Sequence, residues 1–430
     1  MSEFFQRNAE VLQGRWPVLF ERLQREAGDQ LEVELVEGLG STLSVSGIQL
    51  TSRHDRLAEA RLQAESLPAD SSILHVYGSG LGDLQRELLA RPGLTRLRVY
   101  LLNGALFQLV LQLLDQSDWL ADSRVELAYA GDSAEIALPF FALPSELVLA
   151  DDFNAKIRDR LISEAHLADN NRAFDVADAR LQKLLEDSLP LLRQDPDVAA
   201  LFGTQAGRDC YVIATGPTLA GHLPALAKVR GQVDRPLFIC VDTAFLPLLR
   251  AGIQPDIVVS VDHKIRLHHL PPENSAATTL VYMPMLDVEL LGNWRGPRYA
   301  AYSGSALYAQ VREEIPRAEL FVGGSVIHPA TDLAVKMGAG AITLFGADFA
   351  FPGDRTHTGW DDGVLGPAVS AARHWVLDGH GQRVRTQLNF RGYLVELERF
   401  IAHHPQVRFY NTSRAGAQIT GTAFAPEFCP

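Results

Sequence analysis

Polar residues follow four apolar runs of this chain, at the points where each run ends. They are Thr215, Gly216, Pro217 and Thr218 after the first run, Asp242 and Thr243 after the second, Asp262 and His263 after the third, and Asp348 after a later one. Because a doubly wound parallel sheet binds its ligands beyond the carboxyl ends of its strands, we expect these residues to share one site. The Gly-Pro-Thr turn alone is a weak signal: it serves either the geometry of a strand-to-helix turn or the binding of an anion.

A Gly-Gly-Ser turn precedes the run that ends at Asp348. Gly324 and Ser325 can turn a backbone N–H group and a hydroxyl toward a phosphate. The structural alternative is that Ser325 caps the following helix and that His328 is a packed histidine near the helix start, which we favour for His328. His328 remains a candidate because this turn holds it near the same edge of the sheet.

Beyond Asp348 lies a polar loop, Pro352 to Gly363, of the kind that carries catalysis at the carboxyl edge of a sheet. His357 is the one side chain in it whose ordinary pKa lies near neutrality, which suits a general base. The alternative is a histidine that only packs or caps the loop. We predict that His357 and Asp348 are catalytic, that His328 is the rival base, and that the site has no metal ligands.

Six apolar runs in the second half of the chain alternate with helical patterns. They predict strands at 210–214, 237–241, 257–261, 279–283, 320–322 and 341–345. Strands that alternate with helices are typical of a doubly wound parallel sheet. The predicted fold class is therefore α/β, with a Rossmann-type catalytic domain preceded by a smaller α/β amino-terminal domain.

The amino-terminal domain contains a strand pattern at 73–77, a glycine-rich turn at 78–82 and a second strand pattern at 97–102. Nucleotide-binding folds place an acidic residue at the end of the second strand to hold the ribose, whereas this chain has Asn103 there. We therefore predict that the glycines serve a tight turn. The predicted boundaries are 1–150 for this domain, 151–200 for a helical connector, 201–385 for the catalytic domain, and 386–430 for a carboxy-terminal helix and tail.

The composition argues against several classes of protein. The 430 residues include 39 Lys and Arg against 52 Asp and Glu, a net charge of −13, which disfavours a broad surface for nucleic acid or anionic lipid. The three cysteines, Cys210, Cys240 and Cys429, form no CxxC pair and predict neither a disulfide framework nor a zinc site. No secretion signal or membrane span is visible, so we expect a cytoplasmic protein.

The motifs, taken together, resemble those of the motility-associated factor (Maf) flagellin glycosyltransferases. The likeness lies in GPTL, in CVDTAFLPLLRAGIQPDIVVSVDH, in GGSVIHPATDLAVKMGAGAITLFGADFAF, in the THTG loop, and in NFRGYLVELERFI followed by YNTSRAGAQITGT. It extends from about Arg208 to Thr422. The central domain of that family is similar to bacterial sialyltransferases that use cytidine monophosphate (CMP) sugars, whose related turn has serine at the place of Thr218.

The resemblance implies a GT-A or sialyltransferase-like fold and a particular reaction. A nonulosonic acid of the pseudaminic or legionaminic type would pass from a CMP-sugar to Ser or Thr of flagellin, the acceptor protein, as flagellum assembly and motility require. CMP-nonulosonic acid is then a substrate, no further cofactor is implied, and a role for Mg²⁺ is left open.

The resemblance also assigns residues. Donor phosphate or ribose would contact the Gly-Pro-Thr turn, Ser325 would lie near the phosphate, and two carboxylates would face the nucleotide. The predicted nucleotide-sugar site comprises Thr215, Gly216, Pro217, Thr218, Asp242, Thr243, Asp262, His263, Gly324 and Ser325. The sialyltransferases have asparagine at the place of Asp242, and their histidine base falls in the loop that here contains His357.

Two other functions remain as alternatives. A small archaeal family of pterin diphosphokinases shares the central domain, and such an enzyme would use Mg²⁺ held by Asp242, Asp262 and Asp348. An amino-terminal half of about 200 residues is more than this small-molecule reaction requires. The second alternative is a catalytically inactive factor that binds flagellin.

Overall fold

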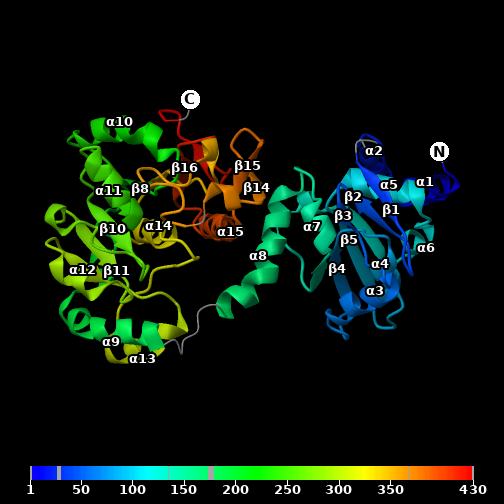
Figure 1. Ribbon diagram of the computed structural model, residues 1–430, viewed down its shortest axis with the longest axis horizontal. Helices are drawn as coiled ribbons and strands as arrows, with labels where there is room; N and C mark the ends of the chain where they lie inside the picture. Colours follow the sequence, from blue (N-terminus) through cyan, green and yellow to red (C-terminus); the bar gives the residue numbers. More distant parts are fainter. Residues whose placement is uncertain (1, 27–30, 134, 173–178, 367, 429–430) are drawn as a thin grey trace. The chain divides into compact units, whose positions relative to one another are not determined.

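The structure, a computed structural model, describes residues 2–26, 31–133, 135–172, 179–366 and 368–428. The chain divides into two compact units, Met1–His166 and Leu167–Pro430 (Figure 1). The division falls within α8 (Ala155–Arg172), which α9 (Ala179–Gln194) follows. Both helices belong to the stretch expected to form a helical connector. Of the three cysteines, Cys429 lies outside the described residues.

The first unit is built on a four-stranded parallel sheet in the order β6-β5-β4-β7. Alternate residues of these strands, such as Leu74, Val76 and Val99, share one core with the helices, as expected where side chains point to the two faces in turn. The strands are β4 (Ile73–Tyr77), β5 (Arg96–Leu101), β6 (Val125–Tyr129) and β7 (Phe140–Ala142).

Within the described residues before α8, this unit also contains seven α-helices and a small antiparallel sheet. The helices are α1 (Glu3–Arg15), α2 (Pro17–Leu23), α3 (Arg56–Glu65), α4 (Asp83–Leu89), α5 (Gly104–Leu113), α6 (Ser117–Ala121) and α7 (Pro144–Val148). The small sheet pairs β1 (Val33–Val36) with β2 (Thr42–Val45) and β2 with β3 (Ile48–Gln49). Asn103 caps α5 by accepting a hydrogen bond from the N–H of Leu106, which gives this residue a structural use.

The second unit contains an eight-stranded parallel sheet in the order β12-β11-β10-β9-β8-β13-β16-β17. Its strands are β8 (Asp209–Ile213), β9 (Leu237–Val241), β10 (Ile257–Ser260), β11 (Thr279–Tyr282), β12 (Arg298–Ala300), β13 (Ala341–Phe345), β16 (Arg408–Asn411) and β17 (Ala423–Phe424). From β8 the chain builds outward to β12 and then returns to place β13 on the other side of β8. The strand order therefore reverses between β8 and β13, where folds of this type bind ligands.

Helices connect the strands of this sheet, which confirms the predicted α/β fold with its parallel sheet. They are α10 (Leu219–Arg230), α11 (Asp242–Arg250), α12 (Val288–Asn293), α13 (Ala309–Glu314), α14 (Ile327–Lys336) and α15 (Leu388–Ala402). Figure 1 shows α11 and α14 on opposite sides of the strands. An antiparallel hairpin, β14 (His374–Leu377) and β15 (Arg383–Thr386), lies between β13 and α15 in the sequence. No helix in the described part of the chain is long and apolar enough to cross a membrane.

The strand expected at 320–322 is wrong. Leu320 is buried, but its N–H donates to the Tyr302 carbonyl next to an isolated bridge between Tyr302 and Glu319, and the N–H of Phe321 donates to the Asp332 carboxylate. The chain here is irregular because its donors bond to a loop and a helix side chain rather than to a neighbouring strand. Short strands β12, β16 and β17 were not predicted from the sequence.

Candidate functional site

The Gly-Pro-Thr turn lies at the reversal point of the sheet, between β8 and α10. The N–H of Gly216 donates to the Gly346 carbonyl at 2.9 Å. A β-carbon on Gly216 would stand 2.4 Å from that carbonyl and 2.4 Å from Oδ2 of Asp348. Glycine is therefore required at this position because two turns of the protein meet there, whereas the sequence had suggested the close approach of a ligand.

Asp348 joins these two turns. It is buried, and its carboxylate accepts the N–H of Thr218 at 2.8 Å and the Thr218 hydroxyl at 2.6 Å. Burial raises the pKa of Asp348 to about 6, although the hydrogen bonds from Thr218 act in the opposite direction. The donors that we expected to meet a phosphate are thus used by a carboxylate of the same chain.

The polar loop after Asp348 is hydrogen-bonded across the ends of β8 and β9. The N–H of Thr358 donates to the Thr215 carbonyl and its hydroxyl to the Gly216 carbonyl, both at 2.8 Å. The indole N–H of Trp360 donates to the Thr243 carbonyl at 2.9 Å. Sequence reasoning did not select Thr358 or Trp360. The signal was their position on either side of a loop glycine, where donors can fix a loop to strand ends.

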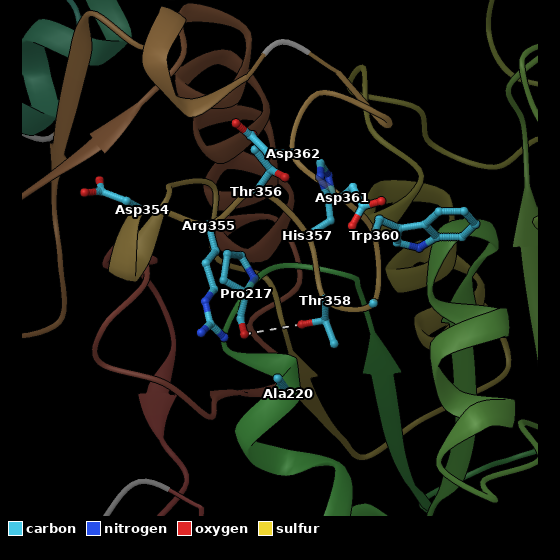
Figure 2. Close-up of a pocket in the computed structure, with 11 residues that line it drawn as sticks. Pro217, Ala220, Asp354, Arg355, Thr356, His357, Thr358, Trp360, Asp361 and Asp362 are labelled. Atoms are coloured by element: carbon cyan, nitrogen blue, oxygen red, sulfur yellow. Dashed lines mark hydrogen bonds between the residues drawn. The ribbon is translucent and has the colours of Figure 1, made fainter.

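A cavity of about 410 Å³ lies between this loop and the first turn of α10 (Figure 2). Its volume suits a small ligand or part of a larger one. Pro217 and Ala220 form one wall, and the loop forms the others with Asp354, Arg355, Thr356, His357, Thr358, Gly359, Trp360, Asp361 and Asp362.

His357 lines the cavity and carries the orphaned polar atom of the site. Its Nδ1 is buried and has no hydrogen-bond partner among the residues that the structure describes, and burial lowers the pKa of the imidazole. At neutral pH the ring is therefore uncharged and able to accept a proton. The structure thus places the predicted general base in the cavity.

The ends of β9 and β10 supply a second polar group next to the turn. Asp242 is buried and accepts the N–H of Thr243 at 2.8 Å and the Ser260 hydroxyl at 2.9 Å. Burial, with a smaller effect of the nearby Asp262 charge, raises the pKa of Asp242 to about 7. The hydroxyls of Thr215 and Thr243 are hydrogen-bonded to each other, which links the first two strand ends.

Asp262 and His263 are only half-buried. Asp262 accepts the N–H of Lys264 at 2.9 Å, and Nδ1 of His263 lies 3.4 Å from its carboxylate. Neither residue lines the cavity, and neither does Asp242 or Thr243. The strand ends therefore adjoin one another as predicted, but of the predicted nucleotide-sugar residues only Pro217 lines the cavity.

The Gly-Gly-Ser turn is packed against α15. Gly324 has φ +96°, and a β-carbon there would stand 2.4 Å from the Tyr393 ring. His328 is completely buried: Nδ1 accepts the N–H of Ser325 at 3.1 Å, and Nε2 donates to the Tyr393 carbonyl at 2.9 Å. Burial lowers the pKa of His328 to about 4. Both ring nitrogens thus have protein partners, and the turn does not line the cavity.

Aromatic rings extend the loop side of the site. The Trp360 ring lies 5.0 Å from the ring of His269 and 6.2 Å from that of His268, between centroids. His269 is fixed in turn because its Nδ1 accepts the N–H of Arg266 at 3.1 Å. Among the described residues, no group of three His, Cys, Asp or Glu side chains is arranged to hold a metal ion.

Two comparisons with known proteins found similarities to this chain. A family model described as 6-hydroxymethylpterin diphosphokinase MptE-like matches residues 184–354. Among solved structures, the chain is similar to the Maf glycosyltransferase from Magnetospirillum magneticum AMB-1, with 15% identity and a TM-score of 0.44 over 99% of this chain and 74% of that one. The sequence has no significant match among curated proteins.

Proposed function

We propose that this protein is a glycosyltransferase that moves a nonulosonic acid, of the pseudaminic or legionaminic type, from a CMP-sugar to Ser or Thr of flagellin. The observation that carries the proposal is the cavity at the reversal of strand order, into which one hydrogen-bonded loop brings the uncharged His357. The sugar, the nucleotide and the acceptor come from the motif resemblance, which spans about Arg208 to Thr422.

Transfer of the sugar requires one general base for the acceptor hydroxyl and groups that stabilise the departing CMP. The acceptor hydroxyl oxygen forms a bond to the anomeric carbon of the sugar, the bond from that carbon to the CMP phosphate oxygen breaks, and CMP leaves with the electron pair. His357 takes the hydroxyl proton as the bond forms and later returns it to water. Because the transition state resembles an oxocarbenium ion, groups that stabilise the departing phosphate add most to the rate.

Two buried carboxyl groups hold together the turn and strand ends beside the proposed site, which we call its frame. Asp348 holds the Gly-Pro-Thr turn through Thr218, and Asp242 holds the ends of β9 and β10 through Thr243 and Ser260. We therefore assign Asp348 and Asp242 to positioning the turn and the strand ends. These hydrogen bonds account for the polar residues at the ends of β8, β9 and β13, but not for Asp262 and His263 after β10.

The match of 184–354 to the diphosphokinase-like family model favours a second candidate, a pterin diphosphokinase. That reaction would call on carboxylates to hold Mg²⁺ between phosphates. Two of the three carboxylates considered for this role, Asp242 and Asp348, accept hydrogen bonds from the protein. Because these two carboxyl groups are already hydrogen-bonded within the protein, the glycosyltransferase is the better-supported proposal.

Mass spectrometry tests the proposal directly. Flagellin is co-expressed with and without this protein in a cell that makes the CMP-sugar, and its intact mass is measured. We expect added nonulosonic acid only when the protein is present, and only with an intact His357. Unchanged flagellin together with ATP-dependent diphosphorylation of hydroxymethyl-dihydropterin would replace the proposal with the kinase. Unchanged flagellin without hydrolysis of the CMP-sugar by the purified protein would favour the inactive binding factor.

A further inference from the structure

Arg355 is a cationic residue that lines the cavity. Its side chain is exposed, and within the described part of the chain it has no ion pair or hydrogen bond. The carboxylates of the same loop do not neutralise it. Asp354 lies 3.6 Å from Arg385, and Asp362 accepts the N–H of Val369 at 3.1 Å. In Figure 2 the guanidinium extends away from these carboxylates toward Pro217 and the start of α10.

The turn beside Arg355 has few donors of its own to offer an anion. The N–H and hydroxyl of Thr218 donate to Asp348, and the N–H of Leu219 donates to the Gly216 carbonyl. Proline has no N–H group. An anion that enters the cavity therefore meets a guanidinium with five free N–H groups next to a turn whose amides are already engaged.

We propose that Arg355 binds the phosphate of the nucleotide in this cavity. This inference rests on the proposed function and deepens it, because it names the group that would stabilise the leaving CMP. A planar guanidinium can donate two parallel hydrogen bonds to one phosphate, which a lysine ammonium cannot. Asp361 and Asp362 also line the cavity, and their negative charges would repel a phosphate. A phosphate bound there therefore needs a cation in direct contact with it.

Calorimetric titration of the full chain with CMP and with cytidine tests this assignment, because the two ligands differ only in the phosphate. We expect Arg355→Gln to weaken CMP binding by about 10- to 100-fold, as for the loss of a charge-assisted hydrogen bond, and to leave cytidine binding unchanged. Arg355→Lys keeps the charge without the two-pronged geometry and should recover part of the loss. Arg295→Gln is the matched control, since Arg295 is an exposed arginine in the loop between α12 and β12.

Equal weakening of CMP and cytidine by Arg355→Gln would show a structural role and overturn the assignment, as would unchanged CMP binding. Inorganic pyrophosphate separates this inference from the proposed function. If the parent binds pyrophosphate and Arg355→Gln does not, Arg355 is a phosphate ligand even if no sugar is ever transferred. If the parent fails to bind pyrophosphate and CMP, the assignment is wrong. Melting curves of each variant confirm that it is folded.

Discussion

In both units of the molecule, the hydrogen-bond donors of a glycine-containing turn are satisfied in the same way. In each, a glycine-containing turn follows the first strand of the sheet, and a carboxylate from beyond the strand on the opposite side enters that turn. In the first unit, Glu146 accepts hydrogen bonds from the N–H of Gly80 and from the Ser79 hydroxyl. In the second, Asp348 accepts two from Thr218. Such turns are often used for phosphate, and here a carboxyl group of the same chain takes that place.

What differs between the units is the loop around the turn. In the first unit the space beside the glycine turn is about 10 Å³, which holds one water molecule at most. In the second unit the loop that contains His357 leaves about 410 Å³. The comparison teaches that the turn is part of the frame in both units, and that the capacity to bind a ligand depends on the added loop.

The largest expected effect concerns the loop. His357→Ala should lower flagellin glycosylation by about 10²- to 10⁴-fold, the usual contribution of a general base, while CMP binding and folding stay intact. Quantitative mass spectrometry of flagellin after a fixed time measures the rate.

His328→Ala is the contrasting variant. It should destabilise the second unit, because it removes the partner of the Ser325 N–H and of the Tyr393 carbonyl in a fully buried place. Near-normal transfer by His357→Ala together with a loss of transfer in a folded His328→Ala protein would pass the role of base to His328.

The next effect concerns the frame of the second unit. Gly216→Val should destabilise it by about 3 kcal/mol, because the new side chain overlaps Gly346 and Asp348 in a packed place. Urea unfolding measures this. Gly221→Ala in α10 is the control, since a β-carbon there meets nothing within 4 Å and alanine suits a helix. If Gly216→Val leaves stability unchanged but removes CMP-dependent stabilisation, the ligand rather than the protein requires that glycine.

A smaller effect concerns pH. Burial raises the pKa of Glu146 to about 7 and that of Asp348 to about 6, so between pH 4.5 and 7 these two groups bind more protons in the folded protein than in the unfolded chain. The contribution of these two groups to stability therefore falls as pH rises from 5 to 8, by roughly 2 to 3 kcal/mol for Glu146 and roughly 1 kcal/mol for Asp348.

Urea unfolding at the two pH values, compared with Glu146→Gln, isolates the contribution of the first unit. The variant should lose less stability than the parent over the same pH range. An identical pH dependence of parent and variant would show that Glu146 does not titrate there.

The last prediction is an absence of binding to the first unit. S-adenosylmethionine and NAD should show no binding in calorimetric titration, because Glu146 occupies the glycine turn of the first unit and Asn103 caps a helix where a ribose partner would stand. Micromolar affinity for either ligand would contradict the comparison between the units.

The sequence by itself determined most strands of the large sheet and the edge of that sheet at which polar residues gather. Apolar runs and helical patterns predicted five of the strands of the large sheet to within about a residue, and polar residues at the ends of those runs predicted where a site would lie. These signals are local in the sequence, so they can be read without knowing which segments pack against one another. The run at 320–322 failed because three apolar residues are buried equally well in irregular backbone when their N–H groups find other acceptors.

Only the tertiary structure decided which polar residues meet. Thr218 and Asp348 stand 130 positions apart, and their pairing follows from β13 returning to the side of β8. That return gives Asp348 the donors that the sequence assigned to a ligand. Strand order depends on packing over long separations, which no local pattern encodes, and the division between residues that form the frame and residues that face the cavity depends on it in turn.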